Sequence, residues 1–111
     1  MTHKEKCDLL KKKPPEKRDL CDYYYEVFNQ IGAIKQAYGD YMVTEPINCD
    51  EELKRVPTGD YDLCCALMTM LFREDHFFGY GCFDRRCGNG DVQKIIDRML
   101  TLLDDRKVGL S

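Results

Sequence analysis

The residues best suited to chemistry in this sequence lie between positions 71 and 86, which read LFREDHFFGYGCFDRR. Arg73 and His76 come directly before two phenylalanines, Phe77 and Phe78. Arginine can hold a carboxylate or a phosphate through two parallel hydrogen bonds, and histidine can donate, accept or carry a proton near neutral pH. Aromatic rings offer flat faces on which a base can stack. This stretch therefore predicts a site for a ring-bearing anion.

We expect Arg73 to hold the anion and His76 to assist, because residues three apart share one face of a helix. Two further arginines follow on a short helix and could close the same pocket. The predicted ligand-binding residues are Arg73, His76, Phe77, Phe78, Tyr80, Arg85 and Arg86. The alternative is a purely structural role, in which Arg73 pairs with Asp62, Asp75 or Asp84 and the phenylalanines, Phe83 included, fill the core.

The sequence has seven cysteines, an odd number that argues against a disulfide framework in a reducing compartment, and it has no recognisable catalytic motif. Cys82 and Cys87 are the closest pair of candidate zinc ligands, but no second pair with matching spacing exists, so we expect no cofactor. Whether these two cysteines bind a metal or pack as small apolar residues stays open. They would be nucleophiles only if Arg85 or Arg86 lowered their pKa. We therefore predict a non-enzymatic protein without catalytic residues.

Charge and length limit the classes of partner. The chain has 111 residues, a net charge of −3 and a pI near 5.4, which predicts one domain with little attraction for nucleic-acid polymers or anionic membranes. No apolar run approaches the ~20 residues that a membrane span needs. The first residues lack the apolar stretch of a secretory signal. We expect a cytoplasmic protein.

The elements that must position the site are predicted to be helices. A helix or arm at 1–14 begins at Thr2, and a long helix opens at Pro15 and ends at Gly39, with a kink or a close helix contact at Gly32. A short helix at 50–55 is capped by Asn48 or Asp50. A nearly all-apolar helix at about 60–75 forms the centre, and a short helix, a final helix from Asp91 and a loose tail at 106–111 follow. The prediction is a single domain, 1–111, in which a compact all-α bundle of four to five helices surrounds the central one.

The stretch DLCCALMTMLFREDHFFGYGCFDRRCGNGDVQKIIDRML resembles the signature of a small bacterial and phage-borne family of domains of unknown function. In that signature an apolar helix ends in an arginine, an acidic residue, a basic residue and a phenylalanine, and glycines precede a final amphipathic helix. The matching positions are Arg73, Asp75, His76, Phe77, Gly79 or Gly81, Gly90 and Arg98. The resemblance implies a stand-alone domain that acts inside a bacterial host cell.

Together these observations predict a small-ligand-binding module that forms homo-oligomers and holds a nucleotide-like anion. By analogy with small phage proteins, it would sequester a nucleotide messenger of host immunity. A second hypothesis is an inhibitor or adaptor that binds a host enzyme through an acidic surface. A third is a small hydrolase, in which His76 would act as the acid or base.

Overall fold

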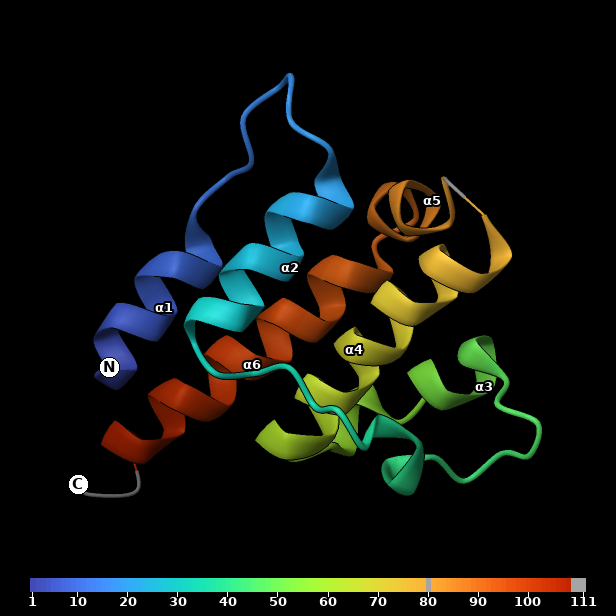
Figure 1. The fold of residues 1–111 in the computed structure, drawn as a ribbon. Helices are drawn as coiled ribbons and strands as arrows, with labels where there is room; N and C mark the ends of the chain where they lie inside the picture. Colours follow the sequence, from blue (N-terminus) through green and yellow to red (C-terminus); the bar gives the residue numbers. More distant parts are fainter. Residues whose placement is uncertain (80, 109–111) are drawn as a thin grey trace.

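The computed structural model describes residues 1–79 and 81–108, and within these ranges the chain is built from helices alone. The all-α bundle is confirmed (Figure 1). Six α-helices occur in the described ranges, where four or five were expected. They are α1 (His3–Lys11), α2 (Leu20–Gln30), α3 (Cys49–Leu53), α4 (Tyr61–Phe78), α5 (Cys82–Gly88) and α6 (Asp91–Val108), with two 3₁₀ helices, η1 (Tyr38–Tyr41) and η2 (Val56–Thr58).

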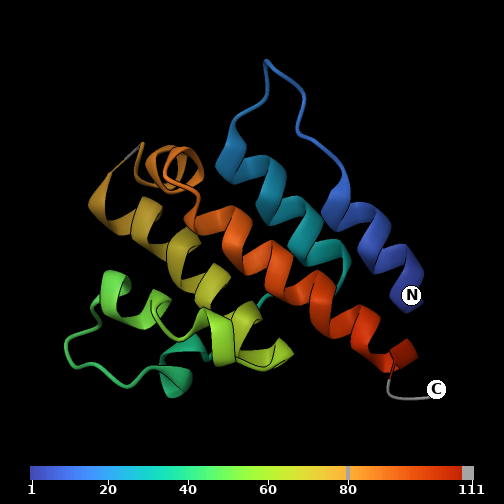
Figure 2. The same cartoon turned by 180° about the vertical axis from the view of Figure 1, so that it is seen from behind.

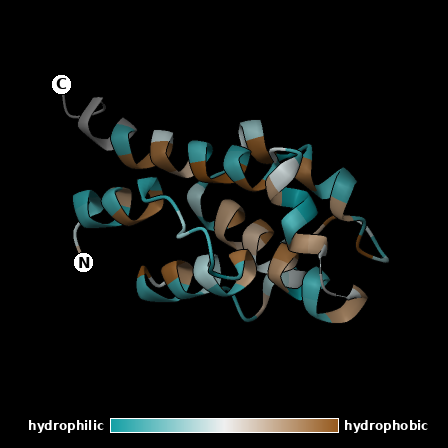
Figure 3. Cartoon of the chain, turned by 90° about the horizontal axis from the view of Figure 1, so that it is seen from above, coloured by the Kyte–Doolittle hydropathy of each residue, from teal (hydrophilic) through white to brown (hydrophobic). Residues whose placement is uncertain are grey.

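The central helix of the bundle is α4, as its apolar sequence predicted. Asp60 caps it by accepting a hydrogen bond from the backbone N–H of Leu63 at 2.8 Å. All ten residues from Leu63 to Phe72 are buried, which a helix achieves only when other elements cover it on every side. Figures 1 and 2 show α6 beside α4, and in Figure 3 the hydrophobic parts of the helices turn toward the middle of the bundle. The core therefore lies along α4.

The second helix is shorter than its apolar stripe predicted. It begins at Leu20, where Asp19 caps it, rather than at Pro15, and it ends at Gln30 rather than near Gly39. Gly32 has a φ of +71° and closes a Schellman turn, in which the N–H of Ala33 donates to the carbonyl of Phe28 at 2.8 Å. Gly32 thus ends the helix rather than kinking it, and the chain continues through irregular backbone to η1.

The remaining elements follow the sequence closely. Thr2 and Glu5 form a capping box at the start of α1, and Asn48 rather than Asp50 caps α3. Helix α6 begins at Asp91 and continues to Val108, so its last turn includes the first half of the segment 106–111 that was expected to be loose. Residues 109–111 lie outside the described part of the chain. Across the described ranges, no helix combines the length and the apolar character that crossing a membrane requires.

Gly32→Ala should lower the free energy of unfolding by about 1–2 kcal/mol, because a Cβ disfavours the left-handed backbone that this position adopts. Chemical denaturation followed by circular dichroism measures the effect. Gly39→Ala is the matched control: Gly39 has no left-handed φ and no atom within 4 Å of an added Cβ. An equal loss in both variants would contradict the assignment of Gly32 as the helix stop.

Candidate functional site

Exposure to solvent increases abruptly in the last two turns of α4. After the buried stretch, Arg73, Glu74 and Asp75 are half-buried, and the three residues that follow are exposed. Phe77 and Phe78 keep 69% and 79% of their surface in water, which is unusual for two adjacent phenylalanines. Gly79, with a φ of +110°, then ends the helix. The predicted site therefore begins where the core ends.

The structure divides the predicted site between two cavities that share Arg73. A cavity of about 430 Å³ between α2 and α4 contains His76, with Tyr25 and Phe72 as aromatic walls. A second cavity of about 240 Å³ lies between α4 and the segment 38–49, and it contains Phe77 and Phe78. Arg73 lines both. His76 and the exposed phenylalanines therefore flank the arginine from different sides.

Arg73 makes no hydrogen bond and no ion pair with any described residue, so the expected alternative of pairing with Asp62, Asp75 or Asp84 is not realised within that part of the chain. Asp75 instead accepts a hydrogen bond from the backbone N–H of Phe83 at 3.0 Å, and Asp62 pairs with Lys35 at 3.2 Å. A half-buried guanidinium without a protein partner keeps its donors for another molecule. Arg73 is therefore the strongest candidate in the predicted set.

Arg86 has a structural role, which corrects the expectation that it faces a ligand. Its side chain is only 7% exposed and lies among three carboxylates. Nε and Nη2 donate to the two carboxylate oxygens of Glu74 at 3.0 and 2.8 Å, and Nη1 donates to Asp50 at 2.6 Å and to Asp91 at 3.0 Å. These contacts connect α3, α4, α5 and α6. In this Arg86 cluster carboxylates accept four of the five N–H donors of the guanidinium and balance its charge, so it is poorly suited to holding an anion.

Titration behaviour in the Arg86 cluster follows from these contacts. Burial by itself would raise the pKa of Glu74, but the hydrogen bonds and the charge of Arg86 lower that pKa overall. The hydrogen bond from Arg86 also lowers the pKa of Asp50. Both carboxylates are thus held in their charged form. Because their native pKa values are lowered, the stability that they contribute is present at neutral pH and is lost on acidification.

The remaining predicted residues fall outside the two cavities or outside the described ranges. Arg85 is exposed and lines neither cavity. Phe83 is fully buried and stacks on Phe72 with ring centroids 5.2 Å apart, so it belongs to the core. Tyr80 lies outside the described residues. The part of the predicted set that meets at a cavity is Arg73 with His76 on one side and with Phe77 and Phe78 on the other.

The positions that carry the family resemblance divide into two kinds. Some have a structural explanation: Asp75 binds the first turn of α5, and Gly79, Gly81 and Gly90 adopt φ values of +110°, +99° and +90°. Arg98 donates from Nε to the carbonyl of Gly59 at 3.0 Å. Arg73, His76 and Phe77 have no comparable role: His76 only meets the Phe77 ring edge-on at 5.2 Å. These three residues are therefore the ones for which the described part of the chain gives no structural explanation.

Cys87 lacks the lowered pKa that a nucleophilic thiol needs. Burial, with a smaller effect from the charge of Asp84, raises the pKa of Cys87 to about 11, so its thiol is protonated at neutral pH. The condition for a nucleophilic Cys87 is therefore not met. Both Cys82 and Cys87 are free and half-buried, and no group of three or more potential metal ligands gathers in the part of the chain that the structure describes.

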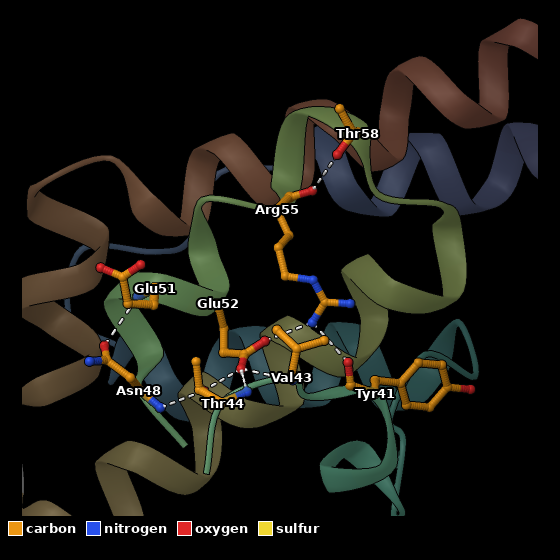
Figure 4. Close-up of polar contacts among 8 residues, drawn as sticks. All are labelled: Tyr41, Val43, Thr44, Asn48, Glu51, Glu52, Arg55 and Thr58. Atoms are coloured by element: carbon orange, nitrogen blue, oxygen red, sulfur yellow. Dashed lines mark hydrogen bonds and ion pairs between the residues drawn. The ribbon is translucent and has the colours of Figure 1, made fainter. Parts of the chain in front are cut away.

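A buried carboxylate that the sequence analysis did not single out positions the wall opposite α4. Glu52 is fully buried and accepts hydrogen bonds from the backbone N–H groups of Val43 and Thr44 at 3.0 and 2.7 Å and from the Thr44 hydroxyl (Figure 4). Arg55 donates to Glu52 at 2.7 Å and to the Tyr41 carbonyl at 2.8 Å. Burial alone would raise the pKa of Glu52, but these hydrogen bonds lower it. The carboxylate thus fixes the segment that carries Pro46 and Ile47.

Sequence reasoning also missed a cavity of about 560 Å³ between α3, η2 and α6, which Arg73 does not line. It contains Lys94 and Arg98, four residues apart on one face of α6. That spacing was readable in the sequence. What could not be read was the apolar wall that the α3–η2 segment places against it.

Comparison with known protein families, with curated proteins and with solved structures found no match to this chain.

Arg86→Leu should lower the free energy of unfolding by about 3–5 kcal/mol, because it leaves Glu74 buried without its counter-charge. Chemical denaturation at pH 7 measures this loss. The wild-type protein should also lose stability as the pH falls below the ordinary carboxyl range, and the variant should show a weaker loss, because Arg86 no longer lowers the pKa values of Glu74 and Asp50.

The double variant Arg86→Leu, Glu74→Leu is the control for the cluster. It removes the buried charge together with its partner and should recover a large part of the stability. A double variant as unstable as Arg86→Leu would mean that the loss comes from packing rather than from the unpaired carboxylate.

Glu52→Gln should destabilise the protein by about 1–3 kcal/mol, because the amide cannot accept all the hydrogen bonds that the carboxylate accepts. Glu51→Gln is the neighbouring control, since Glu51 makes only an exposed ion pair with Lys54, and such pairs contribute about 0–1 kcal/mol. Amide hydrogen exchange should increase at 43–44 in Glu52→Gln alone. Unchanged protection there would contradict the role of Glu52 in fixing this segment.

Proposed function

We propose that this protein is a non-enzymatic binding module for a small, ring-bearing anion such as a nucleotide, held at the end of α4. Arg73 grips the anionic group, and the ring lies on Phe77 or Phe78 in the cavity between α4 and the segment 38–49. His76 assists from the other side of the arginine. The observation that carries this proposal is the half-buried guanidinium of Arg73, which has no partner among the described residues.

The chemistry of the cavity fits such a ligand. Guanidinium donors bind phosphate or carboxylate oxygens in pairs, and the partial burial of Arg73 strengthens such charged hydrogen bonds. Tyr38 lines the same cavity as Phe77 and Phe78, so a planar ring would meet aromatic surface there. Glu74 also lines it, but its charge is engaged by Arg86 at 2.8 Å and opposes an anion less than a free carboxylate would.

The wider role that we propose follows from the family resemblance and from this ligand class. A phage-borne module that binds a nucleotide tightly and does not turn it over would remove an immune messenger from the cytoplasm of the bacterial host. Self-association into homo-oligomers is part of the same proposal, since it would enclose the rings of Phe77 and Phe78 and raise the affinity for a shared ligand.

A second candidate function is binding to a host protein. The exposure of Phe77 at 69% and Phe78 at 79%, with Val43 at 72% and Ile47 at 41%, favours it, because exposed aromatic residues are common anchors of protein interfaces. The net charge of −3 would suit a partner with a basic surface. In this case Phe77→Ser would abolish capture of the partner, whereas Arg73→Gln would leave capture largely intact.

Calorimetry with a panel of cyclic nucleotides and ADP-ribose derivatives tests the first proposal. A ligand of the panel should bind to the wild-type protein, and Arg73→Gln should weaken its binding about tenfold or more, because charged hydrogen bonds are lost. Arg85→Gln is the matched control, since it removes the same charge from an exposed arginine that lines neither cavity. The absence of heat with every ligand, or equal effects of the two variants, would contradict the proposal.

A further inference from the structure

The cavity between α3, η2 and α6 has the size and lining of a ligand site. Its volume of about 560 Å³ is within the range of ~300–1,000 Å³ that is common for small-molecule pockets. Leu53, Val56 and Pro57 form an apolar wall, and α6, which crosses the front of the molecule in Figure 2, supplies the charged wall. This cavity shares no lining residue with the two at Arg73, so it can be tested separately.

Some of the charged side chains around this cavity have ion-pair partners among the described residues, and others have none. The acidic residues that line it are Asp50, Asp91 and Asp97, and the basic ones are Lys54, Lys94 and Arg98. Asp50 and Asp91 already bind Arg86, at 2.6 and 3.0 Å, and Lys54 pairs with Glu51 at 2.9 Å. The charges left outside any ion pair with described residues are Lys94, Arg98 and Asp97. Two cations thus remain against one carboxylate.

Arg98 is held in a fixed orientation for binding. Its Nε donates to the carbonyl of Gly59 at 3.0 Å, which restrains the guanidinium plane. The two terminal amino groups have no hydrogen-bond partner among the residues that the structure describes. Lys94 lies one turn earlier on α6 and makes no ion pair within the same ranges. A restrained guanidinium whose two terminal nitrogens are available is well suited to binding a carboxylate.

Nearby acidic residues select for an anion with a single charge. Asp97 accepts a hydrogen bond from the Gln93 amide at 2.8 Å but has no cationic partner in the described ranges, whereas Asp50 is already paired with Arg86. Among the described residues, the unpaired charges of Lys94, Arg98 and Asp97 give a local excess of one positive charge, which a monoanion balances and a phosphate dianion exceeds. The apolar wall, in turn, favours a hydrocarbon body over a strongly hydrated one.

We propose that this cavity binds an organic carboxylate with an apolar body. The carboxylate lies on Arg98 and Lys94, and the apolar part packs against Leu53, Val56 and Pro57. Two sources present this chemistry: a free aliphatic acid, and the C-terminus of a peptide whose last side chain is apolar. The site is independent of the anion site proposed at Arg73.

Titrations of ¹⁵N-labelled protein followed by NMR test this site with matched pairs of probes. Octanoate should shift the amide signal of Val56 and the Nε signal of Arg98 in a saturable way, and octanol should not. Acetyl-glycyl-leucine compared with its C-terminal amide tests the peptide source. Binding by only one of the two acids identifies the source and supports the site; equal effects of acid and neutral probe, or tighter binding of inorganic phosphate, would overturn it.

Variants with opposite expected effects make the test specific. Lys94→Gln should weaken octanoate binding several-fold to about tenfold, and Asp97→Asn should strengthen it, because one removes an attractive charge and the other a repulsive one. Lys17→Gln is the control for net charge, since Lys17 is exposed on the α1–α2 connection. These exposed substitutions leave the Arg98–Gly59 contact in place. Equal affinities of Lys94→Gln and Lys17→Gln would refute the assignment.

Discussion

The guanidinium of Arg86 joins four helices of this bundle and thereby fixes the end of α4, where the candidate site lies. It binds Glu74 through two parallel hydrogen bonds and reaches Asp50 and Asp91 through its third nitrogen. A buried arginine needs such partners, because a charge removed from water is costly unless other charges and hydrogen bonds replace the water. The acidic start of α3, the short helix α5 and the start of α6 therefore converge on one point next to the candidate site.

This arrangement explains why neighbouring residues of α4 differ in role. Glu74 turns toward Arg86 and Asp75 toward the backbone of Phe83, so both acidic residues are used to hold α5. Arg73 is left without a counter-charge among the described residues, and Phe77 and Phe78 extend beyond the core into water. At this helix end the acidic side chains already bind α5, whereas the cation and the two aromatic rings have no such partner in the described ranges. Such an arrangement is better suited to binding another molecule than to stabilising the fold.

Glu52 contributes to the same region from the opposite wall. A carboxylate that is fully buried and that accepts backbone hydrogen bonds from Val43 and Thr44 holds an irregular segment in place without a helix or a strand (Figure 4). A fixed wall matters for binding, because a ligand that must order a loose segment loses affinity to the entropy of that ordering. The segment that faces α4 across the cavity of Phe77 and Phe78 is thus restrained by internal hydrogen bonds and an ion pair.

The sequence by itself determined the all-α class, the buried centre at α4 and most helix ends, because caps, prolines and the 3.6-residue spacing act locally. Its main error in the fold was at 31–38, where apolar residues continue the helical spacing although Gly32 has already ended α2; Ile31 and Ala33 are buried all the same, so burial there does not imply a helix. For the candidate site, residue types pointed to the C-terminal end of α4 but could not distinguish the role of Arg73 from that of Arg86. The two arginines differ because Asp50 and Asp91, which lie on other helices than α4, pack against Arg86 and not against Arg73. Only tertiary packing decides which arginine the carboxylates neutralise and which one has no ion-pair partner among the described residues.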